Sequence, residues 1–528
     1  MFPKEELMKK ILILACLVPG LLFANGSSET TKTAPAATSK TNIVNATGFP
    51  IVTEPLSMTV FGIRDSNQAP WKDIYVFNEY EKKTGIHMEW QETPDQGRDE
   101  KKSLLFAGNE LPDLFFRPQL SLAEMEKYGV QSHQLMPLND LLKNYAPNLT
   151  KILNENPELR KALTCSDGNI YGLPQLDFSA TGSTGFKQWI NKTWLAKLGL
   201  KEPTNTDEFL TVLRAFKTQD PNGNGEADEI PLGIRESSSI YQLGGSWGLE
   251  FQMGNTINVN DGKVHFWLKD AAFKEYLQYL NQLYKEGLLW KDYYKRDLPK
   301  WRSNLSTATF GAFYMPYSDV FRNVEDQFEG LTPLVGPHGD QIWSAVNGSL
   351  VSQGAFAISN VCKNPEAAIR WVDYFYGDEG ALFFRYGVEG VTYDLDADGQ
   401  PQFKDSILND PKGFMTALGK INTVPGGANP TVITDETDGV VASKLTKEVA
   451  AMMMPYVPKK IYLTPSFNQD EMDEYIAITQ DLNTYRDQAV TKFIIGEWGF
   501  DKWDEYCTTL DKIGLPKLEQ IYQQASDR

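Results

Sequence analysis

The residues best suited to bind a cation lie in one short loop, residues 220–229, which reads DPNGNGEADE. Oxygen-bearing side chains occupy every second position from Asp220 to Asn224, and Gly225 permits a tight turn after them. Calcium takes about six to eight oxygen ligands at about 2.3–2.6 Å, and this alternation directs successive oxygens toward one point. The loop therefore predicts a structural calcium ion, Ca2+, with the ligands Asp220, Asn222, Asn224, the Glu226 carbonyl group, Asp228 and Glu229.

The alternative for this loop is a solvated Asn-Gly turn after a helix, because Pro231 stands where an EF-hand has its closing Glu. A second acidic run at 394–405, DLDADGQPQFKD, also has EF-hand spacing, but the segments on both sides of its Asp-Gly pair resemble strands. Asp-Gly is a favoured turn between antiparallel strands. We therefore predict a β-hairpin at 394–405.

No pattern singles out a catalytic residue. The run GGSWG at 244–248 matches G-x-S-x-G, but that motif needs a strand before its serine and the preceding ESSSIYQL is a poor buried strand. Cys165, Cys362 and Cys507 are too widely spaced for a disulfide framework or a zinc site, and the four His residues are scattered. We predict that the protein is not an enzyme, although two acids brought together by folding, as in glycoside hydrolysis, remain an alternative.

Several aromatic residues lie beside Gly, Pro, Ser or other polar residues rather than in apolar periodic patterns. Each one taken alone is compatible with core packing, but together they indicate a cleft with flat apolar walls, which suits sugar rings. We predict stacking on the sugar by Trp247 and Tyr317, with further contacts from Trp71, Trp189, Trp343 and Tyr314 and a polar rim at Arg117 and Glu389. The sequence leaves open whether the sugar is neutral or acidic, since Arg117 could pair with a carboxylate.

Composition limits the possible partners. The 528 residues include 51 Lys and Arg against 69 Asp and Glu, so the formal charge of −18 argues against binding to nucleic acid. With 41% hydrophobic and 23% charged residues the chain is globular, and its length indicates two or three domains.

The amino-terminal residues predict export. Lys9 and Lys10 precede an apolar run at 11–23 that ends at Ala24, which fits a secretory signal peptide at 1–24. Residues 25–48 are rich in Ser, Thr, Ala and Asn and predict a disordered leader. Lipidation at Cys16 is the alternative, but the apolar run continues past it. We expect a periplasmic protein, with a lipid anchor at the cell surface as the alternative.

Apolar spacing predicts alternating helices and strands. The pattern predicts a strand at 57–63 and then a helix that gives way to a strand at Gly85. Helices are predicted at 203–219, with Asn205 and Glu208 at capping-box spacing, and at 271–287. A short strand is predicted at 354–359, and 469–526 reads as helices throughout. This alternation indicates the α/β class.

Segments along nearly the whole mature chain resemble those of the extracellular solute-binding proteins of ABC importers, in the branch that includes alginate-binding periplasmic proteins and LipO-type lipoproteins. The matching segments are EYEKKTGIHMEW, LLFAGNELPDLFF, MPLNDLLKNYAPNL, SDGNIYGLP, WLAKLGLKEPTNTDEFLTVLRAFKTQDPNGNGEADEIPL, LYKEGLL, KNPEAAIRWVDYFY, YGVEGVTYD and WDEYCTTLDKIGLPKLEQIYQQA. An aromatic residue that the family carries between about 420 and 435 has no counterpart in NTVPGGANPTVITDE.

The resemblance implies an α/β, two-lobed periplasmic-binding-protein fold (type II-like) with hinge strands and a helical carboxy-terminal segment. It assigns 49–182 plus about 346–425 to an amino-terminal lobe, and about 183–345 plus about 426–528 to a carboxy-terminal lobe. It also implies that a carbohydrate binds between the lobes, near 246–248 and Tyr317, and that the loop at 220–229 holds calcium. The expected function is that of a monomeric substrate-binding component that delivers an oligosaccharide to ABC permease subunits. The alternatives are a secreted carbohydrate-active hydrolase and a chemosensory ligand-binding protein.

Overall fold

The computed structural model describes residues 43–234, 237–252, 255–260, 262–295, 297–440 and 442–528. The predicted signal peptide and residues 25–42 of the predicted leader lie outside the described residues. Of the last part of that leader, the structure describes 43–48: Val44 forms an antiparallel bridge with Val52, and the Asn45 amide donates to the Pro50 carbonyl at 2.8 Å.

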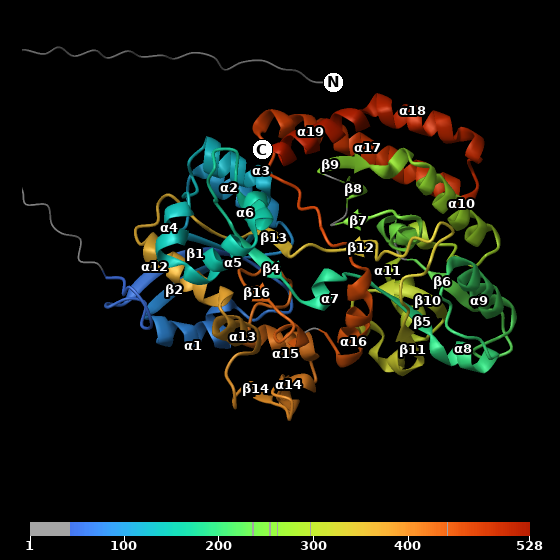
Figure 1. Ribbon diagram of the computed structural model, residues 1–528. Helices are drawn as coiled ribbons and strands as arrows, with labels where there is room; N and C mark the ends of the chain where they lie inside the picture. Colours follow the sequence, from blue (N-terminus) through green and yellow to red (C-terminus); the bar gives the residue numbers. More distant parts are fainter. Residues whose placement is uncertain (1–42, 235–236, 253–254, 261, 296, 441) are drawn as a thin grey trace, which may run out of the picture. The chain divides into compact units, whose positions relative to one another are not determined.

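A six-stranded sheet forms the core of the first group of elements, in the order β16-β4-β13-β3-β1-β2 (Figure 1). Its strands are β1 (Leu56–Arg64), β2 (Ile86–Pro94), β3 (Leu114–Leu120), β4 (Leu173–Asp177), β13 (Leu350–Ile358) and β16 (Val432–Ile433). Every strand pair in it is parallel except for β13, which runs antiparallel to both β3 and β4. All five residues of β4 are buried, as expected of a strand covered on both faces.

Helices cover this sheet and bury large aromatic side chains against it, including Tyr80, Phe116 and Trp371. They are α1 (Tyr75–Thr84), α2 (Arg98–Gly108), α3 (Leu122–Met125), α4 (Asn139–Tyr145), α5 (Pro147–Glu155), α6 (Pro157–Leu163), α12 (Pro365–Asp373), α13 (Asp378–Tyr386), α14 (Asp405–Leu408) and α15 (Phe414–Ile421). The predicted change from helix to strand at Gly85 is confirmed, since α1 ends at Thr84 and Gly85 has a φ of 76°, where glycine is favoured.

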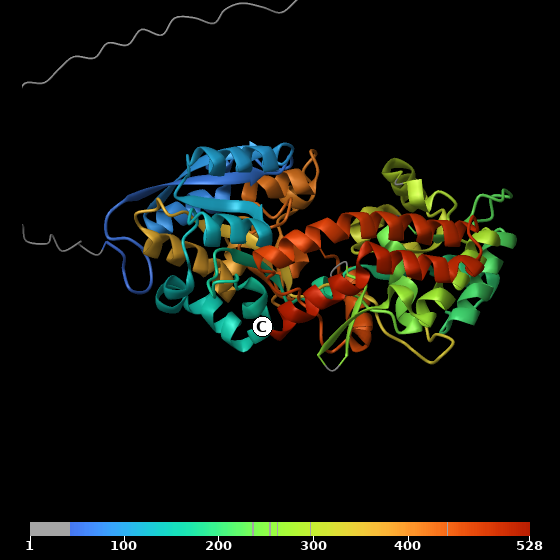
Figure 2. The same ribbon diagram turned by 90° about the horizontal axis from the view of Figure 1, so that it is seen from above.

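A four-stranded sheet, β11-β5-β10-β6, forms the core of the second group. Its strands are β5 (Lys187–Asn191), β6 (Ile230–Gly233), β10 (Phe310–Met315) and β11 (Phe328–Gly330). The helices of this group are α8 (Lys192–Leu198), α9 (Thr206–Thr218), α10 (Ala271–Lys285), α11 (Leu298–Ser306), α16 (Lys444–Met453), α17 (Gln469–Ile495), α18 (Trp503–Ile513) and α19 (Leu515–Asp527). Figure 2 shows α17, α18 and α19 running along this group, which confirms the predicted helical carboxy-terminal segment.

The helix predicted at 203–219 begins with half of its predicted capping box. The Asn205 side chain accepts from the Glu208 N–H at 2.9 Å, as predicted. The Glu208 carboxylate turns instead to the N–H and the hydroxyl group of Thr204, both at 2.8 Å. The helix predicted at 271–287 is α10, and Gly287 follows it with a φ of 67°.

Three small sheets complete the described structure, and one confirms the predicted hairpin. They pair β7 (Phe251–Gln252) with β12 (Ala345–Val346), β8 (Ile257–Asn260) with β9 (Lys263–Phe266), and β14 (Tyr393–Leu395) with β15 (Pro401–Phe403). In the β14–β15 hairpin the Asp396 carboxylate accepts from the N–H groups of Asp398 and Gln400. These hydrogen bonds stabilise the turn.

Among the described residues, the chain passes three times between the two large sheets. The first passage, 178–186, contains α7 (Ala180–Ser183) and joins β4 to β5. The second lies between β11 and β13, and the third leads from β16 to α16, which packs on α7 and β5. Because β16 belongs to the first sheet, we propose that the third crossing lies after residue 433. The other predicted lobe boundaries stay predictions.

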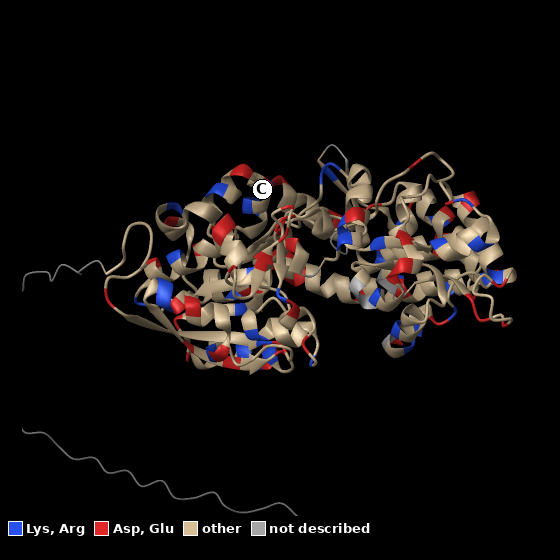
Figure 3. Ribbon diagram, turned by 90° about the horizontal axis from the view of Figure 1, so that it is seen from below, with Lys and Arg blue, Asp and Glu red and all other residues tan. Residues whose placement is uncertain are grey.

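Among the described residues, none of the helices combines the length and the apolar character needed to cross a membrane. Acidic and basic residues are interspersed over the ribbon (Figure 3).

Candidate ligand-binding site

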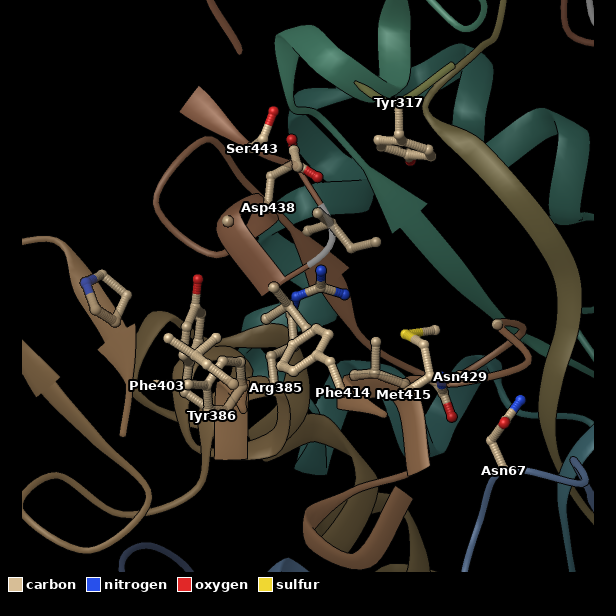
Figure 4. Close-up of a pocket in the computed structure, with 18 of the residues that line it drawn as sticks. Asn67, Tyr317, Arg385, Tyr386, Phe403, Phe414, Met415, Asn429, Asp438 and Ser443 are labelled. Carbon is tan, nitrogen blue, oxygen red and sulfur yellow. The ribbon is translucent and has the colours of Figure 1, made fainter. Parts of the chain in front are cut away.

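A cavity of about 740 Å³ lies where elements of the two groups meet (Figure 4). This volume is in the range of about 300–1,000 Å³ that is typical of small-molecule sites. Asn67 reaches it from the loop after β1, and Asp177 from the end of β4. Tyr317 reaches it from just after β10, Arg385 from α13, and Asp438 from the third passage. A smaller cavity of about 390 Å³ shares Asp177, Tyr317 and Val351 with it, so the hollow extends along the crossing segments.

Aromatic rings form one wall of the larger cavity. Tyr386 stacks on Phe403, with ring centroids 4.8 Å apart, and Phe403 meets Phe414 edge to face at 5.6 Å. Figure 4 shows Tyr317 entering from the opposite side. Leu408 and Met415 also line the cavity and are 42% and 40% exposed, respectively. Exposed apolar side chains in a hollow are typical of a surface that binds a partner or a ligand.

The floor of the cavity carries an arginine and an aspartate that are each only 2% exposed. Arg385, in the last turn of α13, donates from Nε to the Thr437 carbonyl at 2.8 Å, and its Nη2 has no hydrogen-bond partner in the described structure. Asp438 Oδ2 likewise has none. Burial lowers the pKa of Arg385 and raises that of Asp438, while each charge offsets part of the shift of the other.

Two more ionisable residues, Asp177 and Lys187, form hydrogen bonds with the first passage. Asp177, at the end of β4, accepts from the N–H of Ser179 at 2.9 Å and from its hydroxyl group at 2.6 Å. Lys187, which begins β5, donates from Nζ to the carbonyl groups of Thr181 and Gly185, both at 2.7 Å. Its Nζ also lies 5.4 Å from the centre of the Tyr317 ring. Burial lowers the pKa of Lys187 to about 7 and raises that of Asp177.

Of the aromatic residues predicted to contact the ligand, Tyr317 lines the cavity and is half-buried. Trp71, Trp189, Trp343 and Tyr314 are each at most 2% exposed and lie in the cores. The indole N–H groups of the three tryptophans donate to Gln68 Oε1, the Met315 carbonyl and the Thr184 carbonyl, respectively. Tyr314 stacks on Trp343. We therefore correct the prediction for these four residues: polar neighbours in the sequence do not show that an aromatic ring is exposed.

The prediction that Trp247 stacks on the sugar is also corrected. It is 5% exposed and packs on Tyr276 and Tyr279 of α10, with ring centroids 5.0 and 5.1 Å away. The neighbouring Ser246 is buried, and its hydroxyl group donates to the Leu334 carbonyl at 2.8 Å. The glycines around Trp247 reflect close packing, because a Cβ on Gly245 would collide with the Ile342 carbonyl at 1.9 Å.

The two predicted rim residues are placed elsewhere. Arg117 is 1% exposed, and its side chain donates to the carbonyl groups of Gly427 at 2.7 Å and Ile63 at 2.6 Å and to Gln68 Oε1 at 3.2 Å. It therefore ties β3 to the 426–427 turn and lies in the core rather than at the rim of the cavity. Glu389 is exposed and is not among the residues that line the cavity.

Sequence reasoning missed Arg385 and Asp438. One signal for Arg385 was present: it lies on the buried face of α13 with Ala381 and Phe384, where a cation is unusual. Asp438 has no comparable signal, because it begins a short 3-10 helix, Asp438–Val440, and reaches the cavity only through the tertiary fold.

Side-chain oxygens of the loop at 220–229 accept hydrogen bonds from N–H groups of the same loop. Asp220 accepts from the N–H groups of Gly223 at 2.8 Å and Gly225 at 3.1 Å. The amides of Asn222 and Asn224 both donate to the Asp228 carboxylate. Glu229 Oε1 is buried without a hydrogen-bond partner in the described structure. These features fit a calcium ion, since the acidic and amide side chains of the loop lie within hydrogen-bond distance of one another and one carboxylate oxygen lacks a partner among the described residues.

The described part of the chain holds no group of three or more His, Cys, Asp and Glu side chains arranged to bind a metal. A calcium site at 220–229 would therefore depend on amide and carbonyl oxygens besides its acids.

Two α/β groups linked by several crossing segments, with a cavity where they meet, define a two-lobed ligand-binding protein. The sequence profile of the family of bacterial extracellular solute-binding proteins matches residues 66–382. The chain belongs to this family.

Among curated relatives, the fructooligosaccharide ABC transporter substrate-binding protein FusA of Streptococcus pneumoniae serotype 4 is 29% identical over 476 residues, which are 86% of each chain. The polygalacturonan/rhamnogalacturonan-binding protein YtcQ of Bacillus subtilis is 22% identical over 473 residues, 87% of this chain and 89% of the relative.

Solved structures agree with this assignment. S. pneumoniae FusA in complex with kestose superposes with a TM-score of 0.71 at 26% identity, over 89% of this chain and 99% of FusA. The same values hold for an EF-hand mutant of FusA in complex with fructo-nystose. A human-milk-oligosaccharide-binding solute-binding protein of Bifidobacterium longum infantis has a TM-score of 0.76 at 23% identity, over 90% of this chain and 99% of that chain, and shows the fold alone.

Proposed function

We propose that this protein is the substrate-binding component of an ABC transporter, which captures an oligosaccharide in the cavity between its two groups of elements and delivers it to the membrane permease. The observation that carries the proposal is the cavity itself, in which aromatic rings face a buried arginine and aspartate. Membership of the solute-binding family and similarity to FusA support it.

The chemistry of the cavity suits a sugar. A pyranose or furanose ring presents C–H groups, which need an apolar surface, and hydroxyl groups, which need hydrogen-bond partners. Tyr317, Phe403 and Phe414 supply the apolar surface, and Arg385 and Asp438, which also line the cavity, supply a donor and an acceptor. In this proposal the protein binds the sugar unchanged, as a monomer, and has no catalytic residue.

A structural calcium ion at 220–229 is part of the proposal. Asp220 and Asp228 would supply the charge, and Asn222, Asn224, Glu226 and Glu229 the other oxygens. Calcium would give Glu229 Oε1 a partner and hold together a loop that follows α9 directly. The loop lines neither of the two cavities, so its role is in stability.

The family to which the chain belongs consists of extracellular solute-binding proteins. We propose further that residues 1–24 direct export and are removed, and that the mature protein works in the periplasm without a lipid anchor.

The test is binding of purified protein to a panel of oligosaccharides, followed by calorimetry and by an assay for reducing ends. The expected result is saturable binding with the ligand recovered intact. New reducing ends would show a hydrolase instead, and failure of every oligosaccharide to bind would overturn the proposal.

A further inference from the structure

A turn at 424–429 forms part of the wall of the larger cavity, through Val424, Gly427 and Asn429. The Gly427 N–H group donates to the Val424 carbonyl group at 3.1 Å and closes the turn. Figure 4 shows Asn429 on the opposite side of the cavity from Phe403. At Gly427 this side of the wall is backbone alone.

Buried side chains from the first group hold the turn in place. Arg117 donates from Nε to the Gly427 carbonyl group at 2.7 Å. Gln68 donates to the carbonyl groups of Thr423 at 3.0 Å and Pro425 at 2.5 Å. The two donors are 1% and 3% exposed, respectively, and a buried polar group is costly when its hydrogen bonds are lost. The turn therefore cannot easily move away from a group that is added beside it.

The two glycines of the turn have different surroundings. A Cβ on Gly426 would lie 2.6 Å from Arg117 Nη2 and 2.7 Å from Asp65 Cβ, so close packing excludes a side chain there. A Cβ on Gly427 would meet no heavy atom within 4 Å, apart from its neighbours in the chain. Because Gly427 is half-buried and lines the cavity, this open space lies beside the ligand-binding hollow.

Backbone conformation does not by itself explain the glycine at position 427. Its φ of 64° is in the left-handed region, where glycine is favoured. Ala428 follows with a φ of 53° and carries a side chain. The turn therefore accepts a Cβ in this conformation one position further on.

We propose that Gly427 is a specificity-determining residue, whose bare backbone leaves room for one sugar unit of the bound oligosaccharide against the 424–429 turn. This inference rests on the proposed function. Glycine allows a ligand to approach the backbone closely, because it has no Cβ. A side chain at position 427 would occupy the space of that sugar unit, and the turn, held by Arg117 and Gln68, could not withdraw.

The test fills this space. Gly427→Ala adds one methyl group, and Gly427→Asn adds a larger side chain that tolerates a positive φ better than most. Calorimetry on the wild type with kestose, nystose, maltotriose, galactotriose and trigalacturonate identifies the tightest-binding sugar, which is then used for every variant. We expect the affinity to fall about threefold in Gly427→Ala and at least about tenfold in Gly427→Asn, because overfilling a packed site costs more as the added group grows.

Gly399→Asn is the matched control. Gly399 has a φ of 75°, and a Cβ there would also meet no atom within 4 Å. It lies at the exposed tip of the β14–β15 hairpin and lines neither of the two cavities, so this variant should bind the sugar as tightly as the wild type. Thermal unfolding checks that each variant is folded. If Gly427→Asn does not fold, Gly427→Ala is compared with Gly399→Ala instead.

The outcomes separate this inference from the proposed function. Unchanged or tighter binding in Gly427→Asn, or in Gly427→Ala where that variant serves instead, would overturn the inference and leave the proposed function standing. An equal loss of affinity in the Gly399 control would also overturn it, since the effect would not depend on the cavity. No binding of any sugar by the wild type would overturn both.

Discussion

At the scale of single residues, the cavity depends on side chains that are held by backbone groups. Asp177 accepts from Ser179, Lys187 donates to two carbonyl groups of the same short passage, and Arg385 donates to Thr437. Such contacts fix the position of each charge before a ligand arrives, which lowers the entropy cost of binding.

Replacement of Trp247 and of Tyr317 by alanine distinguishes an aromatic residue of the core from one that lines the cavity. Trp247→Ala should cost about 3–5 kcal/mol of folding stability, because it empties a packed site beside Tyr276 and Tyr279. Tyr317→Ala should leave the melting temperature nearly unchanged and weaken sugar binding by about 2 kcal/mol. Thermal unfolding and calorimetry on both variants check this. Intact binding in Tyr317→Ala would remove that ring from the site.

The buried lysine makes stability depend on pH. In the unfolded chain its pKa is near the ordinary 10.5, whereas burial lowers it to about 7 in the folded protein. Between these values the unfolded chain binds more protons, so the lysine's contribution to the free energy of unfolding increases as pH rises from about 7 toward about 10.5.

Lys187→Met lacks this titration. In urea unfolding, the stability of the wild type relative to Lys187→Met should therefore increase between about pH 7 and about pH 9. Parallel changes in the two proteins would mean that the lysine titrates alike in the folded and the unfolded chain.

At the scale of elements, the helix α9 and the loop after it form one unit. Asn205 caps the start of α9, and the 220–229 loop follows its end at once, drawn together by Asp220 and Asp228. The loop's hydrogen bonds are local and exposed to water, and such bonds open easily. A bound calcium ion would hold this segment closed.

Chelation tests the calcium proposal. A ligand that binds only the folded state stabilises it by about 2.7 kcal/mol at about a hundredfold excess over Kd. EGTA should lower the melting temperature of the wild type, and added calcium should restore it. Asp220→Ala should have a lower melting temperature that EGTA does not change. Asp396→Ala, in the hairpin without a metal, is the control and should keep the wild-type response. Equal sensitivity of wild type and Asp220→Ala would refute the assignment.

At the scale of the whole described part of the chain, 43–528, three passages connect the two large sheets, and the larger cavity lies beside the first and the third. Away from the cavity, the carboxy-terminal helices also touch the first group, where Gln131 donates to Gln469 and Lys161 to the Ser526 carbonyl. A ligand held by Tyr317 on one side and Arg385 on the other would favour the conformation in which both reach it.

Closure on the ligand is measurable by small-angle scattering. The radius of gyration should be smaller with a bound oligosaccharide than without it, because the passages can act as hinges. A sugar that the calorimetric panel shows not to bind is the control and should cause no change. An unchanged radius with a saturating, bound sugar would mean that the protein binds without closing.

The sequence by itself determined much of the secondary structure. Apolar periodicity, caps and turn residues act over a few positions, so the change at Gly85, the Asn205 cap, the hairpin at 394–405 and the carboxy-terminal helices could all be predicted. The resemblance of many segments in order also indicated the family, which the profile match confirmed.

Only the tertiary structure decided which side chains face the cavity. Trp71 and Tyr317 both stand beside proline in the sequence, but one is fully buried under β1 and the other lines the cavity. Arg385 and Asp438 are 53 positions apart and meet only because α13 and the third passage converge on one hollow. The exposure of a side chain and its distance from another depend on contacts between segments that are far apart in the sequence. The spacing of neighbouring residues does not determine those contacts.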